Sequence, residues 1–112
     1  MHRRHLVSRS LVLAAGLAFG STAWSQTTIN VAAFADFAGP YANVMNDMQG
    51  GRLAVVDWWN KEVGEKLNVR IAVKTYDTRY DVAQTASLWP GIKAELKPAI
   101  LLGLGGPDAA AL

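Results

Sequence analysis

The chain has 112 residues, of which 51% are hydrophobic and 18% are charged, and it contains no cysteine. This length allows one small domain, and the apolar content is too high for a disordered segment. The lack of cysteine excludes a disulfide bond and a lipid anchor carried by a cysteine. The formal net charge of +2 is modest, and three of the eleven basic residues, Arg3, Arg4 and Arg9, lie close to the N-terminus.

Residues 1–25 have the order of a cleavable secretory signal peptide. The basic opening is followed by an apolar run at 11–20 and by small, uncharged residues up to Ser25. The apolar run is shorter than the ~20 residues that a membrane-spanning helix needs. We expect cleavage after Ser25, with cleavage after Ala23 as the alternative. Residues 26–112 are then an exported domain.

Removal of the signal peptide changes the charge and the chemistry of the chain. Eight basic residues remain against nine acidic ones, a net charge of −1, and both histidines, His2 and His5, are lost. Without a basic stripe, the chain is not expected to bind nucleic acid. Without histidine or cysteine, it lacks the usual general base and thiol nucleophile. The carboxylates are scattered along the chain, so we expect neither an enzyme nor a bound metal or cofactor.

The first half of the domain predicts a strand, a turn and a long helix. Residues 28–34 are apolar and begin with β-branched side chains, and Gly39-Pro40 marks a turn within 36–41. A helix is expected over 43–66. Its core face is expected to contain the apolar residues at three- to four-residue spacing: Val44, Met48, Val55, Trp59 and Val63. The Gly50-Gly51 pair inside this helix is expected to pack closely against another backbone.

The second half predicts two further strands, each followed by a helix. Residues 68–76 alternate between apolar and polar, which is typical of a strand near a sheet edge. A helix at 81–89 begins with Asp81 as its N-cap, and Pro90 either kinks it or starts a second helix that ends at Leu96. The apolar run 98–104 predicts a buried parallel strand. A loop over 105–108 then leads into a helix from Ala109.

The alternation of strands and helices predicts an α/β fold, a doubly wound parallel sheet with strand order 2-1-3. Ligands of such sheets bind beyond the carboxyl ends of the strands, here the loops 36–41, 77–80 and 105–108. Three strands leave an apolar sheet edge open. We therefore expect residues 26–112 to be an incomplete N-terminal lobe, the first part of a longer protein.

Several segments together resemble the start of type I periplasmic binding proteins, in the branch of receptors for branched-chain amino acids (Leu/Ile/Val) that serve ABC transporters. They are the exported N-terminus, residues 38–42 (AGPYA), residues 50–54 (GGRLA) leading to Asn60, and Tyr76-Asp77-Thr78 with Asp81 and Ala83. The resemblance implies a receptor with two lobes and a ligand cleft between them. It also implies a location in the periplasm and delivery of a small solute, such as an amino acid or amide, to an inner-membrane permease.

The resemblance and the fold place four candidate ligand-binding residues at the strand ends: Tyr41, Gly106, Pro107 and Asp108. Tyr41 follows the Gly-Pro turn and offers a ring and a hydroxyl. In the family the last loop commonly carries serine or threonine for a ligand carboxylate, whereas this chain has Pro107 and Asp108. Asp108 is expected to cap its own helix and to repel an anion. An amino-acid ligand is therefore in doubt. A neutral, amide-like or cationic solute remains open, and so does a ligand whose carboxylate is held elsewhere.

Two other functions remain open from the sequence alone. One is an exported α/β hydrolase, and the other is a periplasmic sensor domain, each with its functional residues beyond Leu112. A Gly-x-Ser-x-Gly motif after Leu112 would favour the hydrolase.

Overall fold

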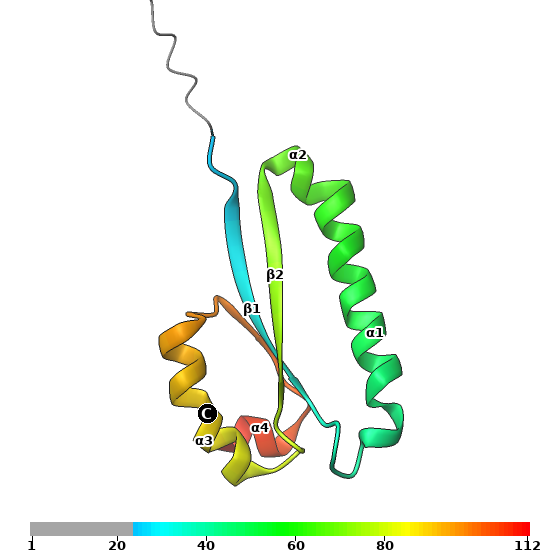
Figure 1. Ribbon diagram of the computed structural model, residues 1–112, viewed down its shortest axis with the longest axis vertical. Coiled ribbons are helices and arrows are strands. Elements are labelled where there is room, and N and C mark those ends of the chain that lie inside the picture. The colour runs from blue at the N-terminus through cyan, green and yellow to red at the C-terminus, as the bar shows by residue number, and fades with distance from the viewer. Residues whose placement is uncertain (1–23) are drawn as a thin grey trace, which may run out of the picture.

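The computed structural model of the chain describes residues 24–112. The predicted signal peptide therefore lies almost entirely outside the described residues. In the described part, a three-stranded parallel sheet has the order β2-β1-β3. Figure 1 shows helix α1 on one side of this sheet, and helices α3 and α4 on the other. The predicted α/β class and the 2-1-3 order are confirmed.

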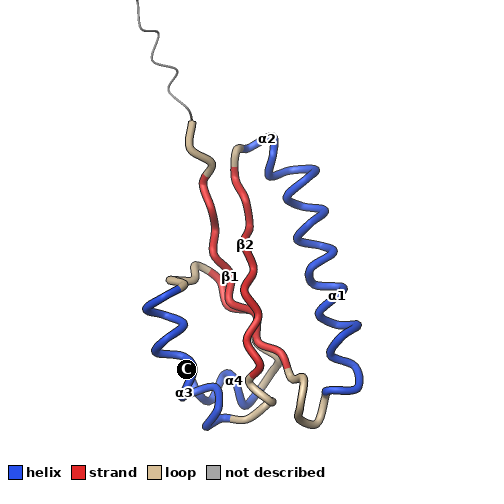
Figure 2. The backbone as a smooth tube through the Cα atoms, viewed as in Figure 1, coloured by secondary structure: helices blue, strands red, loops and turns tan. Residues whose placement is uncertain are grey.

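Strand β1 (Thr27–Ala35) is the central strand, and residues 31–35 are fully buried. Strand β2 (Val69–Asp77) pairs with β1 along the whole length of β1, from Thr27 opposite Val69 to Ala35 opposite Asp77. Strand β3 (Ile100–Leu102) is shorter than the predicted 98–104 because only these residues pair, with 31–33 of β1. All three strands run in the same direction, so their carboxyl ends lie together at one edge of the sheet (Figure 2).

The predicted long helix is α1 (Ala42–Trp59), which continues through a π-helical segment, η1 (Asn60–Gly64), into the short α2 (Glu65–Leu67). The face predicted for its core is wrong in its first part, where Val44, Met48 and Val55 are 44%, 44% and 65% exposed, whereas Trp59 and Val63 are half-buried. The buried residues of α1 are Met45 and Gln49. The Gln49 side-chain amide donates to the hydroxyl of Thr75 on β2. Polar contacts with the sheet therefore set the orientation of α1, and hydrophobic spacing does not reveal them.

The close approach predicted at Gly50-Gly51 is also wrong, since a Cβ added to either glycine would have no neighbour within 4 Å. The close contact occurs at Gly64 instead, where a Cβ would lie 2.5 Å from the backbone oxygen of Val69 and 3.0 Å from the Trp59 ring. Gly64 thus permits the sharp return from η1 and α2 into β2. Asn68 completes this return in the left-handed conformation (φ 54°), which asparagine tolerates better than most residues.

Helix α3 (Val82–Glu95) packs on the opposite face of the sheet. Its predicted N-cap is confirmed, because Asp81 Oδ1 accepts from the Gln84 N–H at 2.7 Å. One helix runs through Pro90, so neither a second helix nor a break occurs there. Buried Ile92 packs with Ala32 and Phe34 of β1 to form the core of this face. The partly buried side chains around them are Tyr76, Leu88, Trp89, Leu96 and Leu101.

Helix α4 (Gly106–Ala111) begins three residues before the predicted start at Ala109. Residues 103–105 alone therefore form the loop after β3, and Gly106, Pro107 and Asp108 belong to the first turn of α4. The Arg52 guanidinium of α1 links the ends of β1 and β3 by donating to the backbone oxygens of Phe34 (2.8 Å) and Gly103 (3.1 Å). Residues 24–112 contain no helix with the length and apolar character to cross a bilayer.

Candidate functional site

The candidate site lies where three loops meet at the carboxyl ends of the strands: 36–41 after β1, 78–81 after β2 and 103–105 after β3. We call this position the crevice. Figure 2 shows these loops beside one another at one end of the sheet. In parallel α/β sheets this is where ligands bind, at the point where successive connections leave toward opposite faces. Here α1 follows β1 on one face and α3 follows β2 on the other.

The loop after β1 is organised around the buried carboxylate of Asp36, which is 0% exposed. Its Oδ1 accepts from the Gly39 N–H and its Oδ2 accepts from the Tyr41 N–H at 2.7 Å. A Cβ at Gly39 would lie 2.5 Å from the backbone oxygen of Arg79, so no larger residue fits without movement. These contacts fix the position of Tyr41, whose side chain is 45% exposed.

The loop after β2 is tied to the first loop and has an unusual backbone. Asp77 Oδ1 accepts from the N–H of Phe37 (3.2 Å) and of Arg79 (3.1 Å). Arg79 and Tyr80 both have positive φ, 54° and 53°. Such a conformation costs about 1–3 kcal/mol for each non-glycine residue, and it persists where the surroundings impose it, often at ligand sites. Here it turns Tyr80 toward the other two loops.

Tyr80 connects all three loops. Its ring packs edge-to-face on Tyr41, with ring centroids 4.8 Å apart and an interplanar angle of 84°. Its hydroxyl lies 3.0 Å from the position of a Cβ on Gly105. Partial burial and the neighbouring Tyr41 side chain raise the pKa of Tyr80, and the charge of Asp108 acts in the same direction. The hydroxyl itself lies beside Gly105.

Asp108 does not have the capping role predicted for it. The N-cap of α4 is Gly105, and no side chain caps this helix. The Asp108 carboxylate is 1% exposed, and it accepts from the Thr85 hydroxyl (3.0 Å) and the Leu104 N–H (2.7 Å). These bonds attach α4 to α3 beneath the crevice. A role for Asp108 toward a ligand stays a prediction.

The structure brings the four predicted site residues to the same end of the sheet, although not with equal access. Tyr41 and Gly106 are exposed, Pro107 is half-buried and Asp108 is buried. Tyr80 was missed in the sequence, because nothing in the pair Arg79-Tyr80 predicts a left-handed backbone. Val44 and Met48, predicted as core, lie exposed one and two turns along α1 from Tyr41.

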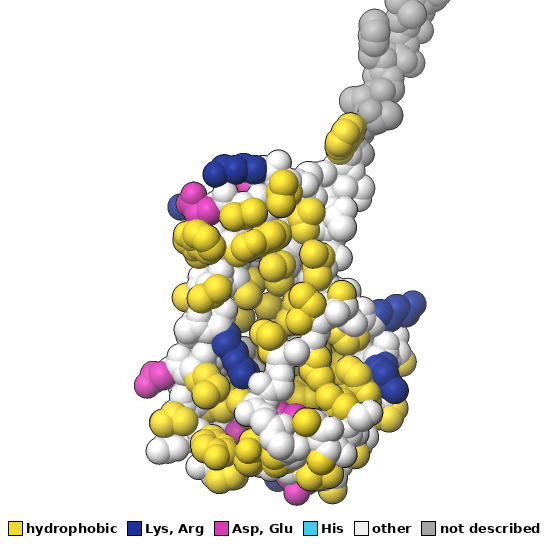
Figure 3. Space-filling view, turned by 180° about the vertical axis from the view of Figure 1, so that it is seen from behind, with side chains coloured by type: hydrophobic (Ala, Val, Ile, Leu, Met, Phe, Trp, Pro, Cys, Tyr) yellow, Lys and Arg dark blue, Asp and Glu magenta, His cyan; other side chains and the backbone are white. Residues whose placement is uncertain are grey.

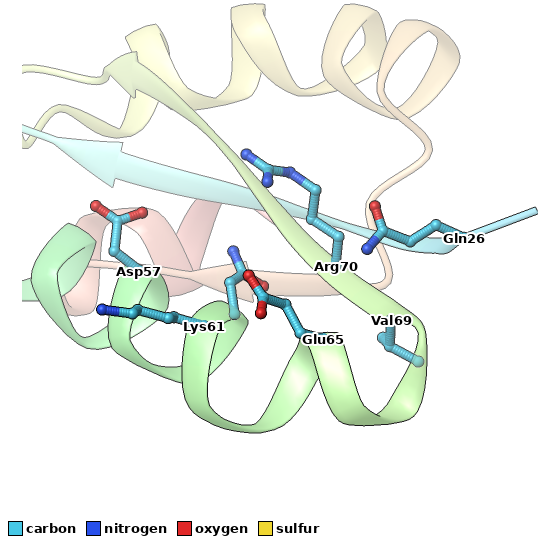
Figure 4. A pocket seen from close by; sticks show the side chains of 7 residues that line it. Gln26, Asp57, Lys61, Glu65, Val69 and Arg70 are labelled. Atoms are coloured by element: carbon cyan, nitrogen blue, oxygen red, sulfur yellow. The ribbon is translucent and has the colours of Figure 1, made fainter.

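The described part of the chain has hollows away from these loops. One, of about 310 Å³, lies near the start of β2, with Asp57, Lys61 and Glu65 projecting from the helical side, Gln26 from just before β1 and Arg70 from β2 (Figure 4). Another, of about 370 Å³, lies between α1 and the sheet and is lined mainly by apolar side chains, among them Val55, Ile100 and Leu102. Figure 3 shows hydrophobic side chains spread widely over the face seen from behind.

Among residues 24–112, no group of three or more side chains is placed to hold a metal ion. A scan against protein-family models found no match, and a search of the curated proteins also found none. A search of solved structures found a similar one, the crystal structure of a possible leucine/isoleucine/valine-binding protein from Rhodopirellula baltica SH 1, with a TM-score of 0.65. The fold is that of a type I periplasmic binding protein lobe.

This likeness concerns the fold, since the sequence identity is 22%. The aligned region covers 81% of this chain and 25% of the Rhodopirellula protein. The chain thus corresponds to one quarter of a chain with this fold. The expected partial lobe agrees with this coverage.

Proposed function

We propose that the chain binds a small solute at the crevice between the loops 36–41, 78–81 and 103–105, as part of a substrate-binding receptor. The observation that carries this proposal is the exposed Tyr41 ring, which Asp36 fixes and Tyr80 supports at the carboxyl end of the sheet. A rigid aromatic side chain at that position offers a surface for the apolar part of a solute and a hydroxyl for its polar part.

The fold likeness to a possible leucine/isoleucine/valine-binding protein supports a binding role rather than catalysis. We further propose that the protein is exported, acts in the periplasm and passes its solute to an ABC permease in the inner membrane. The basic, apolar and small-residue order of residues 1–25 supports export. Amino acids, amides and related small organic compounds are the solute classes to test first.

An NMR titration of the 15N-labelled chain tests the binding proposal. Leucine, valine and leucinamide are added up to tens of millimolar. Because the described loops offer a shallow, one-sided surface, we expect dissociation constants of roughly millimolar size, about −4 kcal/mol of binding free energy. Saturable shifts are expected for amides of the three loops. Absence of saturable shifts with every solute, or shifts spread evenly over the chain, would contradict the proposal.

A matched pair of variants separates the crevice from other exposed aromatic surface. Tyr41→Leu is expected to abolish the saturable shifts, because it removes the ring and hydroxyl fixed by Asp36. Trp58→Leu is the control, since Trp58 is 59% exposed on the second half of α1, away from the loops. Equal loss of binding in both variants would mean that the solutes bind exposed aromatic rings without selectivity.

Export is tested separately from binding. The protein is expressed in a Gram-negative host, recovered from the periplasmic fraction and sequenced from its N-terminus. We expect Gln26 as the first residue, or Trp24 if cleavage follows Ala23. Recovery of the intact chain in the cytoplasm would contradict the export proposal and leave the binding proposal to its own test.

A further inference from the structure

The proposed cleavage point, the bond between Ser25 and Gln26, lies one residue before the sheet begins. Strand β1 starts at Thr27, which stands opposite Val69, the first residue of β2. The Thr27 N–H donates to the backbone oxygen of Asn68 at 3.0 Å. Figure 1 shows the chain entering β1 beside the turn that joins α2 to β2. The chain that follows the proposed cleavage point is therefore part of the fold from its second residue onward.

The same turn also contacts the chain on the other side of this bond. The side-chain amide of Asn68 donates to the backbone oxygens of Trp24 and Ser25, each at 3.4 Å. Asn68 is itself fixed in the turn, because its N–H donates to the Glu65 oxygen at 3.3 Å and its backbone is left-handed (φ 54°). Asn68 thus bonds the chain before the proposed cleavage point with its side chain and the chain after it with its backbone oxygen.

Cleavage needs this part of the chain to open. Signal-peptide removal hydrolyses the Ser25–Gln26 bond with one water, which leaves a carboxylate on Ser25 and an amino group on Gln26. A peptidase holds its substrate as an extended chain on both sides of the bond that it cuts, so these residues must first leave their other partners. Where opening is fast, the rate of cleavage follows the population of the open form. Opening here breaks the Thr27 bond and the contacts of Asn68.

We propose that signal-peptide removal precedes the docking of β1 beside the turn at Asn68, so that a chain that folds first is cleaved slowly. The contacts of Asn68 on both sides of the Ser25–Gln26 bond carry this inference. The inference rests on the proposed export and is independent of solute binding. It makes the substrate of the peptidase the unfolded chain, as it is during translocation.

The test uses the full precursor, purified, refolded and mixed with a bacterial signal peptidase in detergent micelles. Mass spectrometry follows the loss of the intact chain. A variant with Gly-Ser-Gly-Ser inserted between Gln26 and Thr27 moves the bond away from Asn68. We expect this variant to be cleaved about tenfold faster, the effect of one or two hydrogen bonds that no longer need to open. The control has the same insertion after Lys97, which is exposed in the loop before β3, and is expected to be cleaved at the native rate.

A substitution tests the side chain of Asn68 alone. Asn68→Gly keeps the left-handed turn, since glycine adopts a positive φ readily, but it removes the amide that bonds Trp24 and Ser25. We expect this variant to be cleaved several-fold faster than the native precursor. Asn46→Ala is the matched control, because Asn46 is exposed on α1, away from this turn. The circular dichroism spectrum of each chain shows whether it has kept the fold.

The outcomes separate this inference from the proposed export. If the insertion after Gln26 or Asn68→Gly leaves the rate unchanged, the inference is wrong while export stands. Equal acceleration by the insertion after Lys97 would also overturn it, because a general loss of stability would then explain the rates. If no chain is cleaved, even when the precursor is diluted from urea directly into the peptidase, the proposed export fails and the inference falls with it.

Discussion

The side-chain amide of Asn60 pairs with both backbone groups of Ile71. Its Oδ1 accepts from the Ile71 N–H at 2.7 Å and its Nδ2 donates to the Ile71 oxygen at 2.9 Å. Ile71 lies on β2, which has β1 as its only neighbour in the described sheet. Asn60 therefore satisfies backbone groups of an edge strand, and the π-helical turn that starts at Asn60 places its side chain there.

Replacement of Asn60 by alanine tests this edge contact. Each hydrogen bond contributes about 0.5–1.5 kcal/mol, so Asn60→Ala is expected to lower the free energy of unfolding by about 1–3 kcal/mol. Urea denaturation followed by circular dichroism measures the change. Asn43→Ala is the control, because Asn43 is exposed in the first turn of α1. A loss of equal size in the two variants would show that the Ile71 contact adds nothing.

The strand order could be predicted from the sequence because the strands carry clear signals. Residues 31–35 are apolar and buried, and 69–77 alternate as a strand with one exposed side should. Right-handed crossovers then leave few arrangements, and 2-1-3 is the one that places β1 at the centre. These features depend on the local pattern of apolar residues and on the right-handedness of the crossovers, and both can be inferred from the sequence.

The orientation of α1 could not be predicted, because polar residues determine it. Gln49, Arg52 and Asn60 turn toward the sheet, and each makes a hydrogen bond with a strand or strand end. Hydrophobic spacing predicts a different face, the one that contains Val44, Met48 and Val55. A buried polar side chain is stable only when it has a partner, and its partner lies far away in the sequence.

The sequence places the candidate site at the carboxyl ends of the strands, but the chemistry of the loops there depends on tertiary contacts. Tyr41 was identified from its place after the Gly-Pro turn. Tyr80 was not, because its position depends on a positive φ and on its contact with Gly105. Asp108 was assigned to a cap, whereas Thr85 and Leu104 hold its carboxylate. The position of a residue in the sequence predicts that it lies near the end of a strand. It does not predict which group its side chain will bond.

Gly39 and Gly50 are expected to respond in opposite ways to alanine. A Cβ at Gly39 would clash with the Arg79 oxygen at 2.5 Å and with Asp36 Oδ1 at 2.6 Å, whereas nothing lies within 4 Å at Gly50. Gly39→Ala should lower the free energy of unfolding by about 1–3 kcal/mol through overpacking. Gly50→Ala should raise it by about 0.5–1 kcal/mol, the helix propensity difference. Urea unfolding of both variants checks this, and changes of the same sign would refute the geometry.

The link between α3 and α4 depends on the Thr85 hydroxyl. Thr85→Val keeps the shape of the side chain but leaves the buried Asp108 carboxylate with one fewer donor. Such a loss costs about 1–3 kcal/mol in the free energy of unfolding. Ser87→Ala is the control, because the Ser87 hydroxyl is exposed and bonds only the Gln84 oxygen. The prediction is wrong if Thr85→Val and Ser87→Ala unfold at the same urea concentration.

The stability of the chain should depend on the protonation of Tyr80 at high pH. Partial burial and Tyr41 raise the pKa of Tyr80 above its usual value of 10.0 in the folded chain. A raised pKa means that folding favours the neutral hydroxyl. The corresponding stability is fully present below the pKa of the unfolded chain, and it is lost as the pH rises through the pKa of the folded chain.

Thermal unfolding between about pH 8 and pH 11 measures this loss, on both sides of the ordinary tyrosine pKa. Tyr80→Phe removes the titrating group and leaves the ring that packs on Tyr41. The melting temperature of the native chain is therefore expected to fall more steeply than that of Tyr80→Phe once the pH passes about 10. Taking the difference between the two curves removes the contribution of the lysines and other tyrosines that both chains share. Parallel curves would mean that the Tyr80 hydroxyl has the same environment in the folded and unfolded chains, contrary to its contacts with Tyr41 and Gly105.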